Sequence, residues 1–274
     1  MAESKHKTIV HQELELEGNA TKDARFVSSI ARTFEVLRAF RPGEGPLSNA
    51  ELSEVTGLPK ATVARLTHTL KSLGYLTSLG NDNRFEPSPS ILALGYCVLS
   101  NLRVRQLAQP QMTALAKHTS ASVGLASRDR LGMIYLAMTN GSPLRTMRHD
   151  VGTRVNIEKS AIGPAFLAGV TADEKEYFFG HLARKLGAAW PDTRDRIEAS
   201  IAEVRERGFC LVDGEWQRDT RAVACPVVSP DLSTVLAINC VAPSFQIGNE
   251  QLVEDIGPRL AHLASGLVPM MGGT

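Results

Sequence analysis

Residues 47–79 constrain this chain more than any other segment of its 274 residues. Ser48 and Glu51 have the spacing of a capping box, so a helix is expected to begin directly after Ser48. Gly57 suits the left-handed backbone that often follows a helix, and Pro59 suits the first turn of a second one. The segment therefore predicts two short helices joined by a tight turn.

The second predicted helix has two chemically different faces. Its apolar residues recur at helical spacing, at Val63, Leu66, Leu70 and Leu73. The opposite face is small, polar or basic, and residues 59–73 include no acid. Such a face can approach phosphates without repulsion, and a helix-turn-helix places its second helix in the major groove of DNA. The candidates for DNA contact on this helix are Lys60, Ala61, Thr62, Arg65 and His68.

The residues that follow predict a β-wing. Residues 75–77 and 84–85 resemble strands, and the polar stretch 80–83 between them predicts a turn. We expect Arg84 to contact phosphate or the minor groove. Before the unit lies an amphipathic helix that could pack behind it, with apolar residues at Ile30, Phe34, Leu37 and Phe40. These flanking features favour a winged helix-turn-helix over the alternative of an ordinary solvated helix.

Length and composition favour two soluble domains, since a domain usually has about 150 residues. The apolar share of 43% is enough to form cores. No apolar run reaches the roughly 20 residues that span a membrane, and the N-terminus lacks the apolar core of a signal peptide. We therefore expect a cytoplasmic protein without a membrane partner. The net charge is only +1, so DNA binding would depend on geometry and on two copies acting together.

The cysteines and the known catalytic motifs argue against a metal site and against an enzyme. The four cysteines, Cys97, Cys210, Cys225 and Cys240, form no C-x-x-C pair, so we expect buried thiols and no zinc. The chain has no G-x-S-x-G, H-E-x-x-H, P-loop or G-x-G-x-x-G pattern. Two alternatives stay open. One is a thiol-based redox sensor, which needs Cys225 or Cys240 exposed; the other is a winged helix that contacts protein instead of DNA.

The rest of the chain mixes helices and strands without a βαβ rhythm, which predicts an α+β domain around an antiparallel sheet. Strands are expected at 122–126, 133–138, 223–228 and 234–241, and helices at 161–170, 172–179, 197–207 and 251–267. Pro110 is expected to interrupt a helical pattern that continues to residue 118. The predicted organisation is an arm over 1–24, a DNA-binding domain over 25–86, a linker helix over 87–110 and a second domain over 111–274.

Asn239 is the most informative residue of the second domain, because it interrupts an apolar strand. A buried amide costs stability unless it is hydrogen-bonded. Either neighbouring backbone satisfies it or a ligand does. By strand alternation, Ala237, Asn239 and Val241 share one face.

Four segments, in this order, resemble the bacterial IclR-type transcriptional regulators. They are GLPKATVARLTHTLKSLGYL, SAIGPAFLAGV (160–170), VRERGFCLVDGEW (204–216) and AVACPVVSPDLSTVLAINCVAP (222–243), and the likeness covers residues 25 to about 265. The resemblance implies a winged helix-turn-helix, a linker helix and a C-terminal domain similar to GAF ligand sensors. It further implies dimers formed through the N-terminal part, often tetramers, that bind palindromic operators and repress or activate. The usual effectors are small organic acids.

The resemblance also implies where an effector binds. Backbone N–H groups at the start of the 161–170 helix would face it, and such a helix N-terminus favours a carboxylate. Val212 and Ala222 stand where relatives that sense small oxo-acids have an acid and a thiol, which favours a more apolar ligand such as an aromatic acid. No further cofactor is expected. The corresponding positions are Ser160, Ala161, Ile162 and Gly163 at the helix start, Val212, Thr220, Ala222, Asn239 and Val241 on strands, and Leu144, Met147 and Val155 on an apolar wall.

Overall fold

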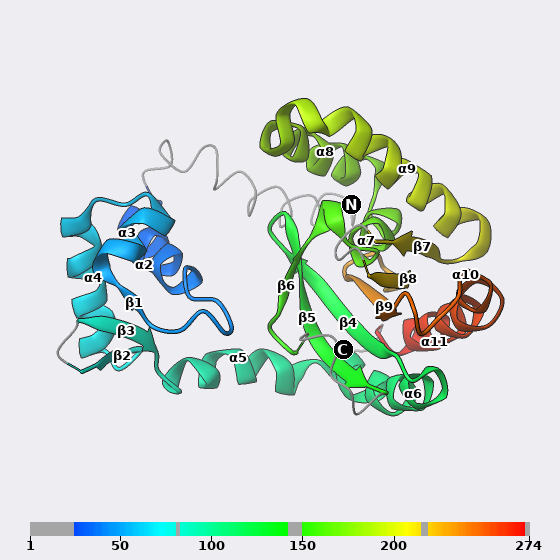
Figure 1. Cartoon of the computed structure of the whole chain (residues 1–274), viewed down its shortest axis with the longest axis horizontal. Coiled ribbons are helices and arrows are strands. Elements are labelled where there is room, and N and C mark those ends of the chain that lie inside the picture. The colour runs from blue at the N-terminus through cyan, green and yellow to red at the C-terminus, as the bar shows by residue number, and fades with distance from the viewer. Residues whose placement is uncertain (1–24, 81–82, 142–149, 215–218, 272–274) are drawn as a thin grey trace. The chain divides into compact units, whose positions relative to one another are not determined.

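The computed structural model describes residues 25–80, 83–141, 150–214 and 219–271. These residues divide into two compact units, with the boundary between Asn101 and Leu102 (Figure 1). Each unit is described by itself. Among the described helices, none is both long enough and apolar enough to cross a membrane.

The N-terminal unit is a winged helix-turn-helix. A three-stranded antiparallel sheet, in the order β1-β3-β2, packs with three helices around a small apolar core that includes Val36, Leu52, Val63 and Phe85. This confirms the fold predicted for the segment. Its elements are α2 (Ser28–Arg38), β1 (Leu47–Ser48), α3 (Asn49–Thr56), α4 (Lys60–Ser72), β2 (Leu76–Leu79), β3 (Arg84–Pro87) and α5 (Ser90–Asn101).

Short-range signals place the ends of α3 and α4 correctly. Ser48 and Glu51 form the predicted capping box at the start of α3. Gly57 follows α3 with φ 69°, a left-handed conformation that glycine adopts without steric cost. Gly74 ends the second helix region with φ 79°. The turn chemistry therefore fixes the helix pair locally.

The predicted apolar faces are only partly buried. The predicted packing of α2 behind the unit is confirmed for Leu37 and Phe40, which lie against the core beside the buried Val36. It is wrong for Ile30 and Phe34, which are more than half exposed. Val55 and Leu73 are also exposed, at 56% and 64%. Apolar spacing identifies a shared helix face but does not tell whether another element covers it.

Two helices occupy the region of the predicted linker. None of the residues of α5, all of them described, is buried. After Leu102 a second helix, α6 (Arg103–Thr119), runs through Pro110 without a break, so the predicted interruption is wrong. Proline removes one hydrogen bond from a helix interior. Ala108 and Met112, on either side of Pro110, are both fully buried, and their packing holds α6 together.

The C-terminal unit contains a six-stranded antiparallel sheet in the order β6-β5-β4-β9-β8-β7. This confirms the predicted α+β class. The strands are β4 (Ser122–Asp129), β5 (Gly132–Asn140), β6 (Arg154–Asn156), β7 (Cys210–Asp213), β8 (Thr220–Val228) and β9 (Val235–Pro243). The helical segments are η1 (Ile157–Lys159), α7 (Ile162–Gly169), α8 (Ala172–Leu186), η2 (Gly187–Ala189), α9 (Trp190–Arg207), α10 (Asn249–Gln251), the π-helical η3 (Leu252–Ile256), α11 (Gly257–Leu267) and η4 (Val268–Met270).

Helices cover both faces of this sheet (Figure 1). On β9, Leu236, Ile238 and Cys240 face the core that includes residues of α6 and α11. Ala237 faces a second core formed with α7, α8 and α9. Alternation along one strand thus supplies side chains to two separate cores.

Candidate nucleic-acid interface and ligand-binding face

The outward face of α4 carries the predicted DNA contacts. Its inner face is buried through Val63, Thr67 and Leu70. The Thr67 hydroxyl also donates a hydrogen bond to Asn49 Oδ1, 2.9 Å away, and so ties α4 to α3. On the outward face, Thr62 is half-buried and the other candidates are exposed: Lys60, Ala61, Arg65 and His68.

Arg84 lies at the wing, but its guanidinium is already bound inside the unit. Nε and Nη2 donate to the Pro46 carbonyl at 3.2 and 2.9 Å. Nη2 also donates to Glu51 Oε1 at 2.9 Å. These internal partners hold the guanidinium, and a contact of Arg84 with phosphate or the minor groove stays a prediction.

Glu51 is the acceptor at the centre of this contact. The Ser48 backbone N–H and hydroxyl both donate to Glu51 Oε2, each at 2.7 Å. The Ser48 donors, with a further contribution from Arg84, lower the pKa of Glu51 to about 2. The carboxylate is therefore charged at every physiological pH.

On the second unit, strand register brings the predicted ligand-binding positions into adjacent rows. Val212 pairs with Ala222, and Ala222 pairs with Val241, so these three lie side by side on β7, β8 and β9. The neighbouring row contains Cys210, Ala224, Asn239 and Gly124. Val155 and Thr220 are buried as well. Leu144 and Met147 lie outside the described residues.

The start of α7 lies against the same face of the sheet. The Cys210 thiol donates to the Ala161 carbonyl at 3.6 Å, which places the first turn of α7 over β7. Gly163 passes so close to η1 that a Cβ there would lie 1.9 Å from the Ile157 carbonyl oxygen. The backbone N–H groups of a first helical turn have no partners within the helix. Ser160, Ala161 and Ile162 are buried at this point.

Asn239 is buried on this face, with 4% of its surface exposed. Its amide nitrogen donates to the Tyr135 hydroxyl at 3.1 Å. Its Oδ1 has no hydrogen-bond partner among the described residues. Burial raises the pKa of Tyr135 to about 12, so the phenol stays neutral. Among the described residues no backbone group satisfies this oxygen, and recognition of a ligand by Asn239 stays a prediction.

The sequence does not reveal that Tyr135 lies beside Asn239. It lies opposite Ala126 because the β4–β5 register shifts between Leu125 and Ala126. The ring fills the space beside Gly124, where a Cβ would lie 2.5 Å from Tyr135 Cε1. Tyr135 reaches Asn239 only through the combined register of β5, β4 and β9.

A second buried polar group lies just before α7. Glu158, in η1, has 2% of its side chain exposed and pairs with Lys185 of α8 at 2.9 Å. Its Oε2 has no hydrogen-bond partner among the described residues. The ion pair joins η1 to α8 and supports the segment that leads into α7.

The buried cysteines argue against the redox alternative. Cys225 and Cys240 are both buried, whereas that alternative needs one of them exposed. Burial raises the pKa of Cys240 to about 12 and also raises that of Cys225. Thiolates are the reactive form, so these thiols are inert. Cys97 is exposed, against the prediction of four buried thiols.

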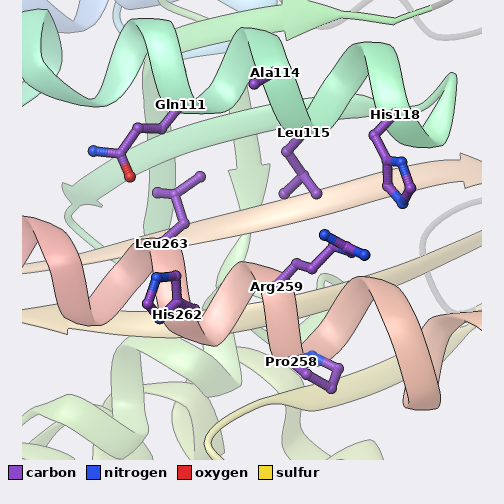
Figure 2. Close-up of a pocket in the computed structure, with 8 residues that line it drawn as sticks. All are labelled: Gln111, Ala114, Leu115, His118, Pro258, Arg259, His262 and Leu263. Atoms are coloured by element: carbon purple, nitrogen blue, oxygen red, sulfur yellow. The ribbon is translucent and has the colours of Figure 1, made fainter.

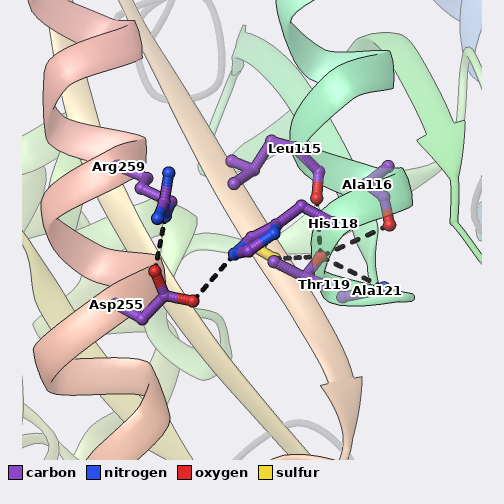
Figure 3. A network of polar contacts seen from close by, with 8 residues as sticks. Leu115, Ala116, His118, Thr119, Ala121, Asp255 and Arg259 are labelled. Atoms are coloured by element: carbon purple, nitrogen blue, oxygen red, sulfur yellow. Dashed lines mark hydrogen bonds and ion pairs between the residues drawn. The ribbon is translucent and has the colours of Figure 1, made fainter.

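A groove of about 610 Å³ lies between α6 and α11 (Figure 2). By alternation along β9, these two helices pack on the sheet face opposite to Asn239. Leu115 and Leu263 extend into the space between the two helices. At one end, Asp255 accepts from His118 Nε2 at 2.9 Å and from Arg259 (Figure 3). Arg259 and then His118 lower the pKa of Asp255. The full lining is Gln111, Ala114, Leu115, His118, Pro258, Arg259, His262 and Leu263.

Two family models match this chain in the order expected from its two units. The model of the IclR helix-turn-helix domain matches residues 29–80, and that of the bacterial transcriptional regulator IclR C-terminal domain matches residues 96–266. The chain belongs to the IclR family of bacterial transcriptional regulators. As a family member it carries a DNA-binding helix-turn-helix and an effector-binding domain, and the family consists of regulators, not enzymes.

Individual relatives agree with the family assignment. The chain is 32% identical over 243 residues to the HTH-type transcriptional regulator TsaQ1/TsaQ2 of Comamonas testosteroni, covering 88% of this chain and 87% of the relative. A crystal structure of an IclR family regulator from Brucella abortus matches with a TM-score of 0.83 and 40% identity, covering 92% of this chain and 96% of that one. An IclR homologue from Microbacterium hydrocarbonoxydans, complexed with 4-hydroxybenzoate, shares the fold, with a TM-score of 0.69, 20% identity and coverage of 88% and 98%.

Proposed function

We propose that this IclR-family protein binds a palindromic operator as a dimer or dimer of dimers and senses a small aromatic acid that also carries a hydrogen-bond donor. The observation that carries the proposal is Asn239 Oδ1, a buried acceptor without a partner among the described residues. It lies on the same face of the sheet as the start of α7. A ligand that bridges these two places would donate a hydrogen bond to Asn239 Oδ1 and accept hydrogen bonds from the N–H groups at the start of α7.

The DNA contacts proposed for α4 follow from its exposed face. The first residues of a recognition helix commonly reach base edges, and Arg65 can pair bidentately with guanine. Lys60, Thr62 and His68 lie on the same surface. The surplus of basic residues in this unit is small, so two units bound to two half-sites would supply the affinity that one lacks.

Exposed apolar residues support self-association through the N-terminal unit. On α2, Ile30 and Phe34 are 55% and 56% exposed. On α5, the exposed apolar side chains are Leu92, Leu94, Tyr96 and Val98. Large exposed apolar surfaces commonly mark contacts between proteins. A second copy of the chain would cover them.

The proposed effector is argued from chemistry at two points of the sheet. The free N–H groups and the dipole at the start of α7 favour a carboxylate. Cys210, which contacts Ala161, lies two strands from Asn239, and strands are 4.7–4.9 Å apart, so the two points are separated by about 10 Å. An aromatic acid hydrogen-bonded at both ends suits that span. A hydroxyl group on the ring would donate to Asn239 Oδ1.

Effector binding would act by shifting a pre-existing equilibrium. A ligand changes the population of a DNA-binding arrangement only as far as it binds one arrangement more tightly than another. A shift from 1% to 99% needs about 5.5 kcal/mol of differential affinity. Either repression or activation is compatible with this mechanism.

The effector proposal is tested by thermal unfolding with matched pairs of acids, each aromatic acid with its ring-hydroxylated counterpart. Ligand at 100 times its dissociation constant should add about 2.7 kcal/mol of stability. The hydroxylated member should stabilise the wild type more, and the Asn239→Leu variant should lose that preference. The proposal is wrong if no acid shifts the melting temperature, or if Asn239→Leu keeps the preference.

The DNA proposal is tested by selection from a random duplex library with the purified protein. A palindromic consensus is expected, with half-sites about one helical turn apart. If no sequence is enriched, the alternative of a winged helix that contacts protein is favoured.

A further inference from the structure

Arg84 occupies a central place in the wing, at the end of the β2–β3 hairpin where β3 begins. It is the first residue of β3, the middle strand of the small sheet. Its backbone lies opposite Leu79 of β2 on one side and Ser48 of β1 on the other. Any shift of Arg84 therefore changes how β3 pairs with both neighbouring strands.

The Arg84 side chain ties this point to the start of α3. It donates to the Pro46 carbonyl just before β1 and to Glu51 in the first turn of α3. The other oxygen of Glu51 is occupied by the two Ser48 donors. One guanidinium and one carboxylate thus join three segments: the wing, the residues before α3 and the α3 cap.

We propose that Arg84 and Glu51 act as a positioning pair, a wing lock that fixes the wing relative to the helix-turn-helix for DNA binding. The inference rests on the DNA-binding role argued above. It assigns Arg84 a role in holding geometry instead of a contact with DNA.

The charge of Glu51 supports this assignment. An acidic side chain in a DNA-binding unit repels phosphates, and its removal should strengthen binding if long-range charge were its only effect. Glu51 and Arg84 are each about 40% exposed, at 42% and 41%, so the ion pair alone contributes little to stability. Each partner is also hydrogen-bonded to the backbone: Arg84 donates to the Pro46 carbonyl, and Glu51 accepts from the Ser48 N–H. These bonds fix the orientation of the pair.

The first test compares Glu51→Gln with Glu54→Gln in full-length protein, using the duplex recovered by selection. Both changes remove one negative charge from α3, and Glu54 is exposed, whereas the acid that pairs with Arg84 is Glu51. Glutamine at position 51 can keep the capping box, so α3 should still form. We expect Glu51→Gln to weaken DNA binding about two- to fivefold and Glu54→Gln to leave it equal or slightly tighter. Equal or tighter binding by Glu51→Gln would overturn the proposal.

The second test separates a lock from a phosphate contact at Arg84. Arg84→Lys keeps the charge but cannot reproduce the fork that reaches two acceptors. The wing lock predicts that Arg84→Lys and Arg84→Gln weaken binding similarly and leave the salt dependence unchanged. A phosphate contact predicts that Arg84→Lys binds nearly as the wild type does, and that Arg84→Gln reduces the slope of log affinity against log salt by about 0.9. That pattern would overturn the proposal.

A third readout needs no DNA, and so separates failure of the lock from failure of the proposed function. Hydrogen exchange is followed in peptides that cover β1 and β3 in the same variants. Glu51→Gln and Arg84→Lys should each speed exchange there, and Glu54→Gln should not. If the wild type selects no DNA but this difference is seen, the lock holds and the DNA-binding proposal fails. If exchange is unchanged in both lock variants, the lock is wrong.

Discussion

At the scale of single residues, the proposed ligand-binding face depends on the absence of a side chain at Gly124. It lies opposite Asn239, and a Cβ there would come within 2.9 Å of Asn239 Oδ1 as well as against the Tyr135 ring. Glycine is needed at this position for close approach, not for an unusual backbone angle. The pair formed by Tyr135 and Asn239 exists because Gly124 leaves it room.

Replacing Gly124 with alanine should therefore destabilise the protein by about 1–3 kcal/mol, as overpacking of a core commonly does. Urea unfolding monitored by circular dichroism would measure the change. Gly180→Ala is the matched control, because Gly180 lies inside α8 with no atom within 4 Å of the added Cβ. That control should gain about 0.5–1 kcal/mol from helix propensity. Equal effects of the two changes would contradict the steric argument.

Arg65 gives a second prediction at this scale. If its guanidinium pairs with guanine, Arg65→Ala should lose about 1–3 kcal/mol of discrimination at one base pair and little elsewhere. Fluorescence anisotropy with singly substituted duplexes would measure it. Lys71→Ala, on the same helix near its end, should weaken binding to all sequences alike, as a phosphate contact does. A uniform loss for Arg65→Ala would make it a phosphate contact too.

At the scale of elements, the sequence predicted where helices begin and end, but not which of their side chains are covered by other elements. Ser48, Glu51 and Gly57 set the bounds of α3 through contacts with near neighbours along the chain. The exposure of Ile30 and Val55 depends on which elements lie beside them, and apolar spacing does not contain that information. The same holds for the candidate site: alternation placed Asn239 and Val241 on one face, but the register shift that brings in Tyr135 is not local.

Asp255 of η3 pairs with His118 of α6 and with Arg259 of α11, and these ion pairs have a defined pH dependence. Asp255 has a lowered pKa in the folded protein, chiefly because of Arg259 and then His118. Its contribution to stability is present above its ordinary pKa of 3.8 and is lost as pH falls through the lower folded value. Asp255→Asn should therefore reduce stability at neutral pH and make it less sensitive to acid below about pH 4. Chemical unfolding midpoints from pH 2 to 7 test this; parallel curves for both proteins would contradict it.

At the scale of the whole molecule, the exposed apolar residues of α5 set the expected assembly. Leu94→Glu combined with Val98→Glu should shift the protein to monomers, because charge on a contact surface opposes its burial. Light scattering after size exclusion would measure the mass. Leu232→Glu is the control, since Leu232 is similarly exposed, at 49%, in the turn between β8 and β9. If the double variant keeps the mass of the wild type, another surface mediates assembly.

The two cores of the C-terminal unit meet along β9, where successive side chains enter opposite layers. Substitutions at positions 237, 239 and 241 can therefore change the ligand-binding face while the core beneath α6 and α11 keeps its packing. A one-residue insertion or deletion at the start of β9 would exchange the side chains that face the two sides of the sheet. It would turn the Asn239 amide toward Leu115 and Leu263. Divergence within this strand is thus expected to proceed by replacement of side chains at alternate positions and not by changes of length.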